Sequence, residues 1–271
     1  MKLNQFIDAH NHLYEGFTLD EMKSVYDSYQ INLGIVSDLT GGSQTNSLGL
    51  RTPEQTIQAN QSVYQAVQNT SFLKGQFFFD CRYDVASQEL FDYLLENRDT
   101  FIGIKIHNPI SQTAANKPVW DGILGFAQEN HIPVMFHTDY TDLCGITQMQ
   151  DVIDRFPELI VILGHSFLDV PAQDVIAFMK KNPKVIGEIS WAKEEKVMEL
   201  IQAIPSERLM FGTDAPVDGE LGRGIPLDPE RANFKWYCPL LERLKELPDE
   251  DYNNLMRYTG EKVYGLSEKC R

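Results

Sequence analysis

Four of the six histidines and one aspartate stand at or near the ends of short apolar runs. His10 and His12 lie in FIDAHNH and His137 in PVMFHT, while His165 follows LIVILG and Asp214 ends RLMFGTD. Imidazole nitrogens and carboxylates are typical ligands of divalent metal ions. If the runs are parallel strands of one barrel, their carboxyl ends meet at one face and gather these side chains into a metal site.

Eight apolar runs of this kind alternate with longer amphipathic stretches, the pattern of buried parallel strands covered by helices. The sequence therefore predicts an α/β fold with a parallel sheet. At 271 residues the chain is long enough for one (β/α)8 TIM barrel, so we expect residues 1–271 to form a single domain. The expected strands lie near residues 5–10, 32–38, 75–80, 101–107, 132–137, 159–164, 184–190 and 208–213.

Helix-start signals support this division of the chain. Thr18 with Glu21, and Thr52 with Gln55, have the spacing of capping boxes, in which two side chains satisfy free backbone N–H groups. Asp228, followed by proline, predicts a further helix start. The stretch from Thr213 to Leu227 is rich in glycine and proline, and it predicts a long loop over the active-site face.

The composition limits the partners of the protein. The formal net charge is −15, whereas binding to nucleic acid or to an anionic membrane needs a basic surface. Cys81, Cys144, Cys238 and Cys270 have neither metal-finger spacing nor the density of a disulfide framework. We find no signal peptide and no transmembrane run. We therefore expect a cytoplasmic enzyme that binds a small-molecule substrate; a homo-oligomer has no signature here.

His10 and His12 are two residues apart. Side chains at that spacing on a strand point the same way, so both imidazoles can reach one ion. By the same alternation, Asp8 is expected one layer deeper in the barrel. The alternative for the motif alone is a pair of ordinary surface or core histidines. The matching positions of His137, His165 and Asp214 favour the metal site.

Such a site leaves a coordination position open, which makes it catalytic rather than structural. A zinc-like ion lowers the pKa of bound water to about 7 and polarises a carbonyl group. Asp214 could take the proton of the water, and a neutral His165 could hydrogen-bond the water or a developing oxyanion. We expect zinc, while manganese, iron and cobalt suit the same ligands.

The motifs DAHNH, GIKIH, FHT, GHS and FGTDAP together resemble the amidohydrolase superfamily, and more narrowly its branch of metal-dependent TIM-barrel hydrolases and decarboxylases. The resemblance runs from about Phe6 to Leu266. It implies that His10, His12, His137 and Asp214 bind one ion, with His165 beside it. In binuclear members, the positions of His137 and His165 hold a second ion, and a carbamylated lysine at the position of Lys105 bridges the pair. We expect one ion, as is usual in this branch.

Lys105 is a second kind of candidate, because a buried ammonium needs a partner. It either pairs with Asp214 or Glu188 and orders the site, or it contacts substrate or becomes carbamylated. His107, two residues on, either contacts substrate or caps a loop. Glu188 lies among isoleucines in the seventh run and is expected to face the site, where it could contact the substrate.

Three weaker substrate-binding candidates lie just past strand ends. Arg82 could clamp a substrate carboxylate, or it could form an ordinary salt bridge with Asp80 or Asp84. Trp191 follows the seventh run and could form a pocket wall. Arg223, in the glycine-rich loop, is either a lid residue or a solvated charge.

The function expected from these residues is metal-dependent hydrolysis of an amide, lactone or ester bond in a small organic substrate. The first alternative is a non-oxidative decarboxylase that uses the same ion to bind a small carboxylic acid. The second is a barrel that binds a small ligand without catalysis, which the retention of the inferred ligands and of Asp214 argues against.

Overall fold

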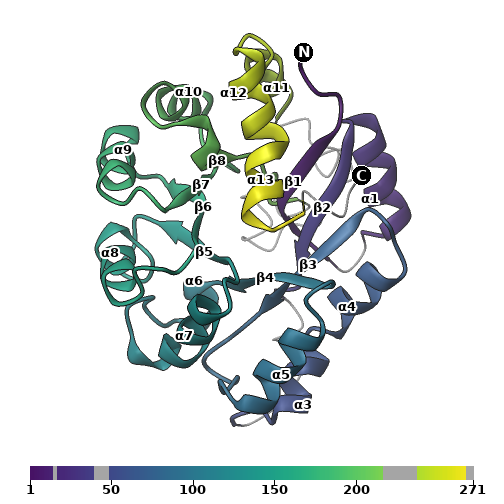
Figure 1. The fold of residues 1–271 in the computed structure, drawn as a ribbon, viewed down its shortest axis with the longest axis vertical. Helices are drawn as coiled ribbons and strands as arrows, with labels where there is room; N and C mark the ends of the chain where they lie inside the picture. Colours follow the sequence, from purple (N-terminus) through teal and green to yellow (C-terminus); the bar gives the residue numbers. More distant parts are fainter. Residues whose placement is uncertain (15–16, 40–48, 216–236, 267–271) are drawn as a thin grey trace.

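The structure is a computed structural model, and it describes residues 1–14, 17–39, 49–215 and 237–266. In these residues, eight parallel strands form one sheet in chain order, and Figure 1 shows them as an inner ring with helices outside. The predicted TIM barrel is confirmed, and each strand overlaps the run expected for it. The strands are β1 (Phe6–His12), β2 (Ile31–Ser37), β3 (Leu73–Phe78), β4 (Phe101–Ile106), β5 (Val134–Asp139), β6 (Val161–Leu168), β7 (Ile186–Glu188) and β8 (Leu209–Met210).

Helices cover the outside of the barrel. Thr18 and Thr52 both form the predicted capping boxes, so two of the helices begin where the sequence indicated. The helices are α1 (Leu19–Ser28), α3 (Pro53–Ala59), α4 (Gln61–Gln68), α5 (Gln88–Glu96), α6 (Asn108–Ser111), α7 (Asp121–Glu129), α8 (Ile146–Arg155), α9 (Ala172–Lys181), α10 (Glu194–Ala203), α11 (Cys238–Leu244), α12 (Asp249–Asn253), the π-helical turn η5 (Asn254–Tyr258) and α13 (Thr259–Val263).

The first and last strands close the barrel through a few backbone contacts. The N–H of Ala9 donates to the carbonyl of Phe211 at 3.0 Å, and the N–H of Asp214 donates to the carbonyl of His10 at 2.7 Å. A parallel bridge joins Asn11 to Ala215 just beyond β8. The chain that follows β8 is therefore held against the end of β1.

The amino-terminal half of the barrel interior is apolar. A separate cluster of buried side chains fills it, with members from most strands together with Tyr264 and Leu266, which follow α13. The hydroxyl of Tyr264 accepts a hydrogen bond from Gln76 Nε2 at 2.6 Å inside the barrel. The carboxyl-terminal segment thus closes this end, and polar side chains are left for the other.

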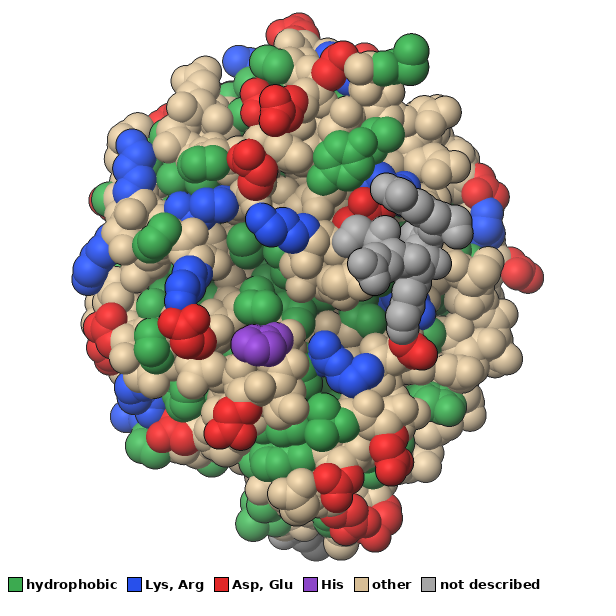
Figure 2. Space-filling view, in the orientation of Figure 1, with side chains coloured by type: hydrophobic (Ala, Val, Ile, Leu, Met, Phe, Trp, Pro, Cys, Tyr) green, Lys and Arg blue, Asp and Glu red, His purple; other side chains and the backbone are tan. Residues whose placement is uncertain are grey.

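The face that Figure 2 shows carries acidic and basic side chains interspersed with apolar ones. No helix among the described residues is both long enough and apolar enough to span a membrane.

Residues 216–236 lie outside the described part of the chain, and with them Arg223, Asp228 and most of the predicted glycine-rich loop. That residues 1–271 form one domain stays a prediction.

Candidate metal centre

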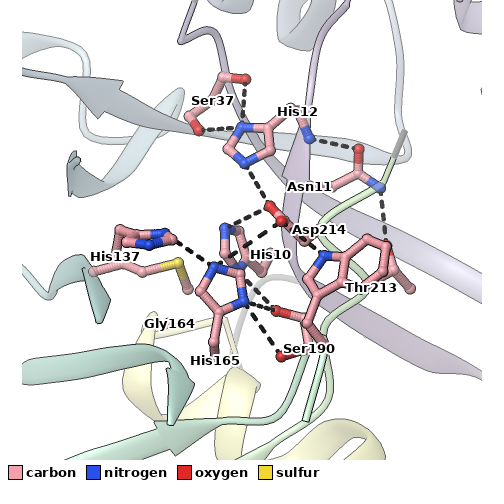
Figure 3. A network of polar contacts seen from close by, with 12 residues as sticks. His10, Asn11, His12, Ser37, His137, Gly164, His165, Ser190, Thr213 and Asp214 are labelled. Atoms are coloured by element: carbon pink, nitrogen blue, oxygen red, sulfur yellow. Dashed lines mark hydrogen bonds and ion pairs between the residues drawn. The ribbon is translucent and has the colours of Figure 1, made fainter. Parts of the chain in front are cut away.

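The carboxyl ends of the strands bring most of the predicted site residues together. Figure 3 shows His10, His12 and His165 around the carboxylate of Asp214, with His137 beside His165. His10 and His12 lie on β1, His137 on β5, His165 on β6 and Asp214 just after β8, and each side chain is mostly buried. The parallel barrel therefore places these five side chains at one face, where His10, His12 and Asp214 form one group of potential ligand atoms and His137 belongs to another, with Asp139 and Cys144.

His10 is held by a carboxylate behind it. Its Nδ1 lies 2.7 Å from Glu188 Oε2 and 3.2 Å from the hydroxyl oxygen of Ser190. Burial, and then the charge of Lys105, hold the pKa of His10 well below its ordinary value, so the ring is neutral. A neutral ring donates from the nitrogen that faces the carboxylate, and the lone pair of His10 is therefore on Nε2.

His12 has the same arrangement with different partners. Its Nδ1 lies 2.9 Å from the hydroxyl of Ser37 and 3.4 Å from the carbonyl oxygen of Ser37. A carbonyl oxygen can only accept, so Nδ1 carries the proton and Nε2 carries the lone pair. Both histidines of β1 therefore present Nε2 to the interior of the site.

These lone pairs converge on Asp214. Its Oδ1 lies 3.1 Å from His10 Nε2 and 2.8 Å from His12 Nε2, and the potential ligand atoms of this group all lie within 4.8 Å of one another. Burial would raise the pKa of Asp214, but its contacts with His10 and His12 and the charge of Lys105 together outweigh burial and hold the pKa below its ordinary value. Two lone pairs that face a carboxylate repel it unless a positive charge lies among them; the ammonium of Lys105 is one such charge, and a bound divalent ion would be another. The donor set therefore fits a divalent metal ion.

Asp8 does not lie below His10 in the barrel, as alternation along a regular strand predicted. Its carboxylate accepts hydrogen bonds from the backbone and side chain of Thr213 and from Asn11. Ala9 joins the apolar cluster instead. The reason is a shift in the β1–β2 register between Asp8 and Asn11, which changes the side to which the following residues point.

Lys105 reaches this group from β4. Its Nζ lies 2.6 Å from His10 Nε2, so the ammonium donates to the lone pair of His10. The hydrogen bond thus goes to an imidazole. Pairing with Asp214 or Glu188 was one of the alternatives considered from the sequence, and the charges of both carboxylates do favour the charged form of Lys105. Burial outweighs them and lowers the pKa of Lys105 to about 8.

His137 and His165 form a second convergence of lone pairs, because His137 Nδ1 and His165 Nε2 lie 3.1 Å apart. The other ring nitrogen of His137 lies 3.4 Å from Asp139 Oδ2, and that of His165 lies 3.3 Å from the carbonyl of Ser190. Each of these outer nitrogens faces an acceptor and carries the proton. His165 Nε2 is 4.0 Å from Asp214 Oδ2, which links the two groups.

The remaining substrate-binding candidates differ in their contacts. The ring of His107 stacks on His137 at 4.2 Å between centroids, and its Nδ1 accepts from the N–H of Ile110 at the start of α6. Trp191 donates its indole N–H to Asp214 Oδ2 at 2.9 Å, so it contacts the cluster directly. Arg82 binds both carboxylate oxygens of Asp80 through its guanidinium. Substrate binding by these residues stays a prediction.

Two residues that the sequence interpretation missed support the histidines. Ser190 contacts the Nδ1 atoms of His10 and His165 and donates to Glu188 Oε2 at 2.8 Å. Asp139 lies behind His137, where Thr141 donates to it as well. Their spacing was a usable signal, because each lies two residues beyond a residue already singled out.

His165, Trp191 and Asp214 share a backbone feature. Their φ angles are 66°, 58° and 56°, in the left-handed region that residues other than glycine rarely adopt. Such conformations persist only where the surroundings hold them, and they gather at functional sites. The strand ends are therefore shaped to aim these side chains.

Comparisons with known proteins identify the family of the chain. A family model described as Amidohydrolase matches residues 7–266. Among curated proteins, the 3'-5' ssDNA/RNA exonuclease TatD of Citrobacter rodentium (strain ICC168) is 26% identical over 176 residues, 62% of this chain and 64% of that protein. The match thus spans less than two thirds of that relative.

Two solved structures share the fold over nearly the whole chain. A dihydroxybenzoic acid decarboxylase from Polaromonas sp. JS666, with manganese and the inhibitor 2-nitroresorcinol bound, has a TM-score of 0.69 at 13% identity and 98% coverage of both chains. A proposed 2-pyrone-4,6-dicarboxylic acid hydrolase from Pseudomonas putida has a TM-score of 0.69 at 15% identity, with 97% of this chain and 98% of that chain covered.

The fold and the cluster of ligand atoms define a TIM barrel with a candidate metal centre at the carboxyl ends of its strands. The chain belongs to the amidohydrolase family, whose model spans residues 7–266, and it is an enzyme of the amidohydrolase superfamily. The resemblance predicted from the strand-end motifs is confirmed.

Proposed function

We propose that the protein is a metal-dependent hydrolase that cleaves an amide, lactone or ester bond of a small organic acid. The observation that carries the proposal is the convergence of His10 Nε2 and His12 Nε2 on Asp214 Oδ1. His10, His12, His137 and Asp214 would hold one ion, with zinc as our first choice. When bound, the ion would supply Lewis-acid polarisation of a carbonyl group and activation of water.

Asp214 and His165 would handle the proton. Asp214 is ionised at neutral pH because its pKa is held below the ordinary value, so it can accept a proton from water and return it to the leaving group. The indole N–H of Trp191 fixes the orientation of that carboxylate. His165 presents Nε2 toward Asp214 Oδ2, where it can accept a hydrogen bond from water or substrate.

We expect an acidic substrate because the ammonium of Lys105 and the proposed ion would place positive charge inside the site. Lys105 is fully buried and its ammonium lies beside His10, so a substrate carboxylate would find a partner there. His107, Trp191, Arg82 and Glu188 are the further candidates for contact with substrate. The proposed partner is thus a small molecule rather than nucleic acid or membrane, and the proposed location is the cytoplasm.

Decarboxylation is the second candidate, and the structural likeness to the decarboxylase from Polaromonas supports it. In that reaction the same carboxylate or His165 would deliver a proton to the carbon that loses carbon dioxide. That neighbour also holds manganese, which makes manganese the second choice of metal.

Metal analysis followed by a substrate panel tests these proposals. The purified protein is expected to bind about one equivalent of zinc or manganese, and the panel contains 2-pyrone-4,6-dicarboxylic acid, simple lactones and amides, 2,6-dihydroxybenzoate and single-stranded DNA. Acid release without carbon dioxide supports the hydrolase, and carbon dioxide release supports the decarboxylase. Less than about half an equivalent of metal, with no activity after adding zinc, manganese or cobalt, would instead support a ligand-binding barrel.

A further inference from the structure

The carboxyl end of β6 does not continue as a regular strand. His165, Ser166 and Phe167 have φ angles of 66°, 45° and 60°, so three successive residues other than glycine are left-handed. All three are buried. Left-handed residues normally occur singly, and a run of three needs specific support from the residues around it.

The pairing of β5 with β6 shows where the irregular segment lies. His137 pairs with Gly164, and Asp139 pairs with Leu168. Thr138 is the single residue between the first members of these pairs, and it lies opposite the three left-handed residues. Residues 165–167 therefore form an extended β-bulge next to the candidate metal centre, which we call the left-handed turn. Bulges next to functional sites commonly redirect side chains.

Alternation along β6 shows what the bulge changes. Ile162 belongs to the apolar cluster inside the barrel, and Leu163 belongs to the cluster between strands and helices. In a regular strand, Gly164 would face inside again and His165 would face the helices. The left-handed turn instead brings His165 to Asp214 and His137.

The hydroxyl of Thr138 spans both ends of this turn. It donates to the carbonyl of Gly164 at 2.7 Å and accepts from the N–H of Phe167 at 2.9 Å. The side chain is fully buried, so water cannot replace these bonds. Lys196 of α10 adds a third bond, because its Nζ donates to the carbonyl of Phe167 at 2.6 Å.

We propose that Thr138 is a positioning residue, whose hydroxyl holds the left-handed turn and thereby aims His165 into the catalytic site. The catalytic part of this inference rests on the proposed function, but the aim of His165 does not. A valine has nearly the same shape as threonine and can make neither bond, whereas serine can make both. The two substitutions therefore separate the hydroxyl from the packing of the side chain.

The experiment compares Thr138→Val, Thr138→Ser and a matched control, Thr100→Val. Thr100 is also buried, and its hydroxyl accepts from Gln68 Nε2 at 2.9 Å next to the amino end of β4. The first readout is the ring ¹⁵N–¹H NMR spectrum of the histidines, recorded without substrate, in which a His165→Gln variant assigns His165. We expect Thr138→Val to move the His165 signals, and Thr138→Ser and Thr100→Val to leave them in place.

The second readout is turnover on whichever substrate the panel identifies. We expect kcat to fall about 10- to 100-fold in Thr138→Val with little change in KM, the scale for a misplaced catalytic group. Thr138→Ser should stay within about threefold of the wild type. Moved His165 signals in a protein that turns over nothing in the panel would support the turn and contradict the proposed function.

Unchanged His165 signals in a folded Thr138→Val protein would overturn the inference, as would equal losses in the valine and serine variants. Should Thr138→Val fail to fold, Lys196→Met removes the bond to the carbonyl of Phe167 from outside the barrel. In that variant, moved His165 signals support the inference and unchanged signals contradict it.

Discussion

The two halves of the barrel interior are built from the same eight strands and have opposite character. In the amino-terminal half, residues such as Ile162 and Met210 pack with Tyr264 and Leu266 into an apolar cluster. In the carboxyl-terminal half, the strands present imidazoles, carboxylates and the ammonium of Lys105, nearly all of them buried.

The difference separates stability from chemistry along the barrel axis. Buried apolar side chains stabilise the fold by roughly 1.5–3 kcal/mol each, whereas buried polar groups are costly unless each has a partner. The polar half meets that condition through Glu188, Ser190 and Ser37 behind the histidines. Substitutions in the polar, carboxyl-terminal half should therefore affect catalysis and metal binding. Substitutions in the apolar, amino-terminal half should lower the free energy of unfolding.

The largest expected effect belongs to Asp214. Asp214→Asn removes the charge that faces His10 and His12 and the group proposed to move the proton. We expect kcat to fall by about 10²-fold or more while the fold is retained, the scale of lost general-base catalysis. Steady-state kinetics measure kcat, and the circular dichroism spectrum shows whether the fold is retained. Asp154→Asn, at an exposed position, is the control, and equal turnover in both variants would remove Asp214 from the mechanism.

Ile162→Ala tests the apolar half. Ile162 is fully buried inside the barrel, so the free energy of unfolding should fall by about 2–5 kcal/mol, while kcat at a temperature where the variant is folded stays within about twofold. Urea unfolding and kinetics on one sample measure both. A large loss of kcat in the folded variant would show that the halves are not separable in this way.

Glu188→Gln tests the support behind the metal ligands. The charge beside His10 Nδ1 is lost, while an oxygen that can accept its hydrogen bond remains. We expect zinc affinity to fall about 10- to 100-fold, as is typical when the partner of a ligating histidine is changed. Competition with a chromophoric chelator measures the affinity. Wild-type affinity in this variant would contradict a supporting role for Glu188.

The smallest expected effect is on the pH dependence of unfolding and belongs to Lys196. It tests whether a helix residue helps to hold the left-handed turn of β6. Burial lowers the pKa of Lys196 from 10.5 to about 8, so between these values the unfolded chain binds a proton that the folded chain does not. The free energy of unfolding should therefore rise with pH in this window, relative to Lys196→Met. Urea unfolding at pH 7 and pH 9.5 measures the difference. Lys184→Met, at an exposed position, should follow the wild type, and a parallel response of Lys196→Met would refute the shift.

The barrel and the composition of the site were predictable because they depend on simple regularities. Short apolar runs indicated the strands, and parallel strands place their carboxyl ends together, so His10, His12, His137, His165 and Asp214 were expected at one face. No side-chain direction beyond the regular alternation was needed for this step.

The remaining features depend on backbone irregularities that the sequence does not encode locally. The register shift after Asp8 turns His10 and His12 into the barrel, so that Ala9 faces the interior and Asp8 does not. The left-handed turn of β6 points His165 into the barrel, whereas regular alternation would point it toward the helices. The bond from Lys105 to His10 joins strands that are distant in the sheet order, and short-range patterns contain no information about such a pair.

The contact between the two ends of the sheet has a consequence for biosynthesis. His10 and Asp214 are brought together only when β8 and the segment after it reach β1, which requires the chain as far as Ala215 to have left the ribosome. An ion that binds His10, His12 and Asp214 jointly would therefore favour the completed barrel over every shorter nascent form. Metal loading would therefore follow closure of the barrel, and metal supply would influence how much newly made protein escapes degradation.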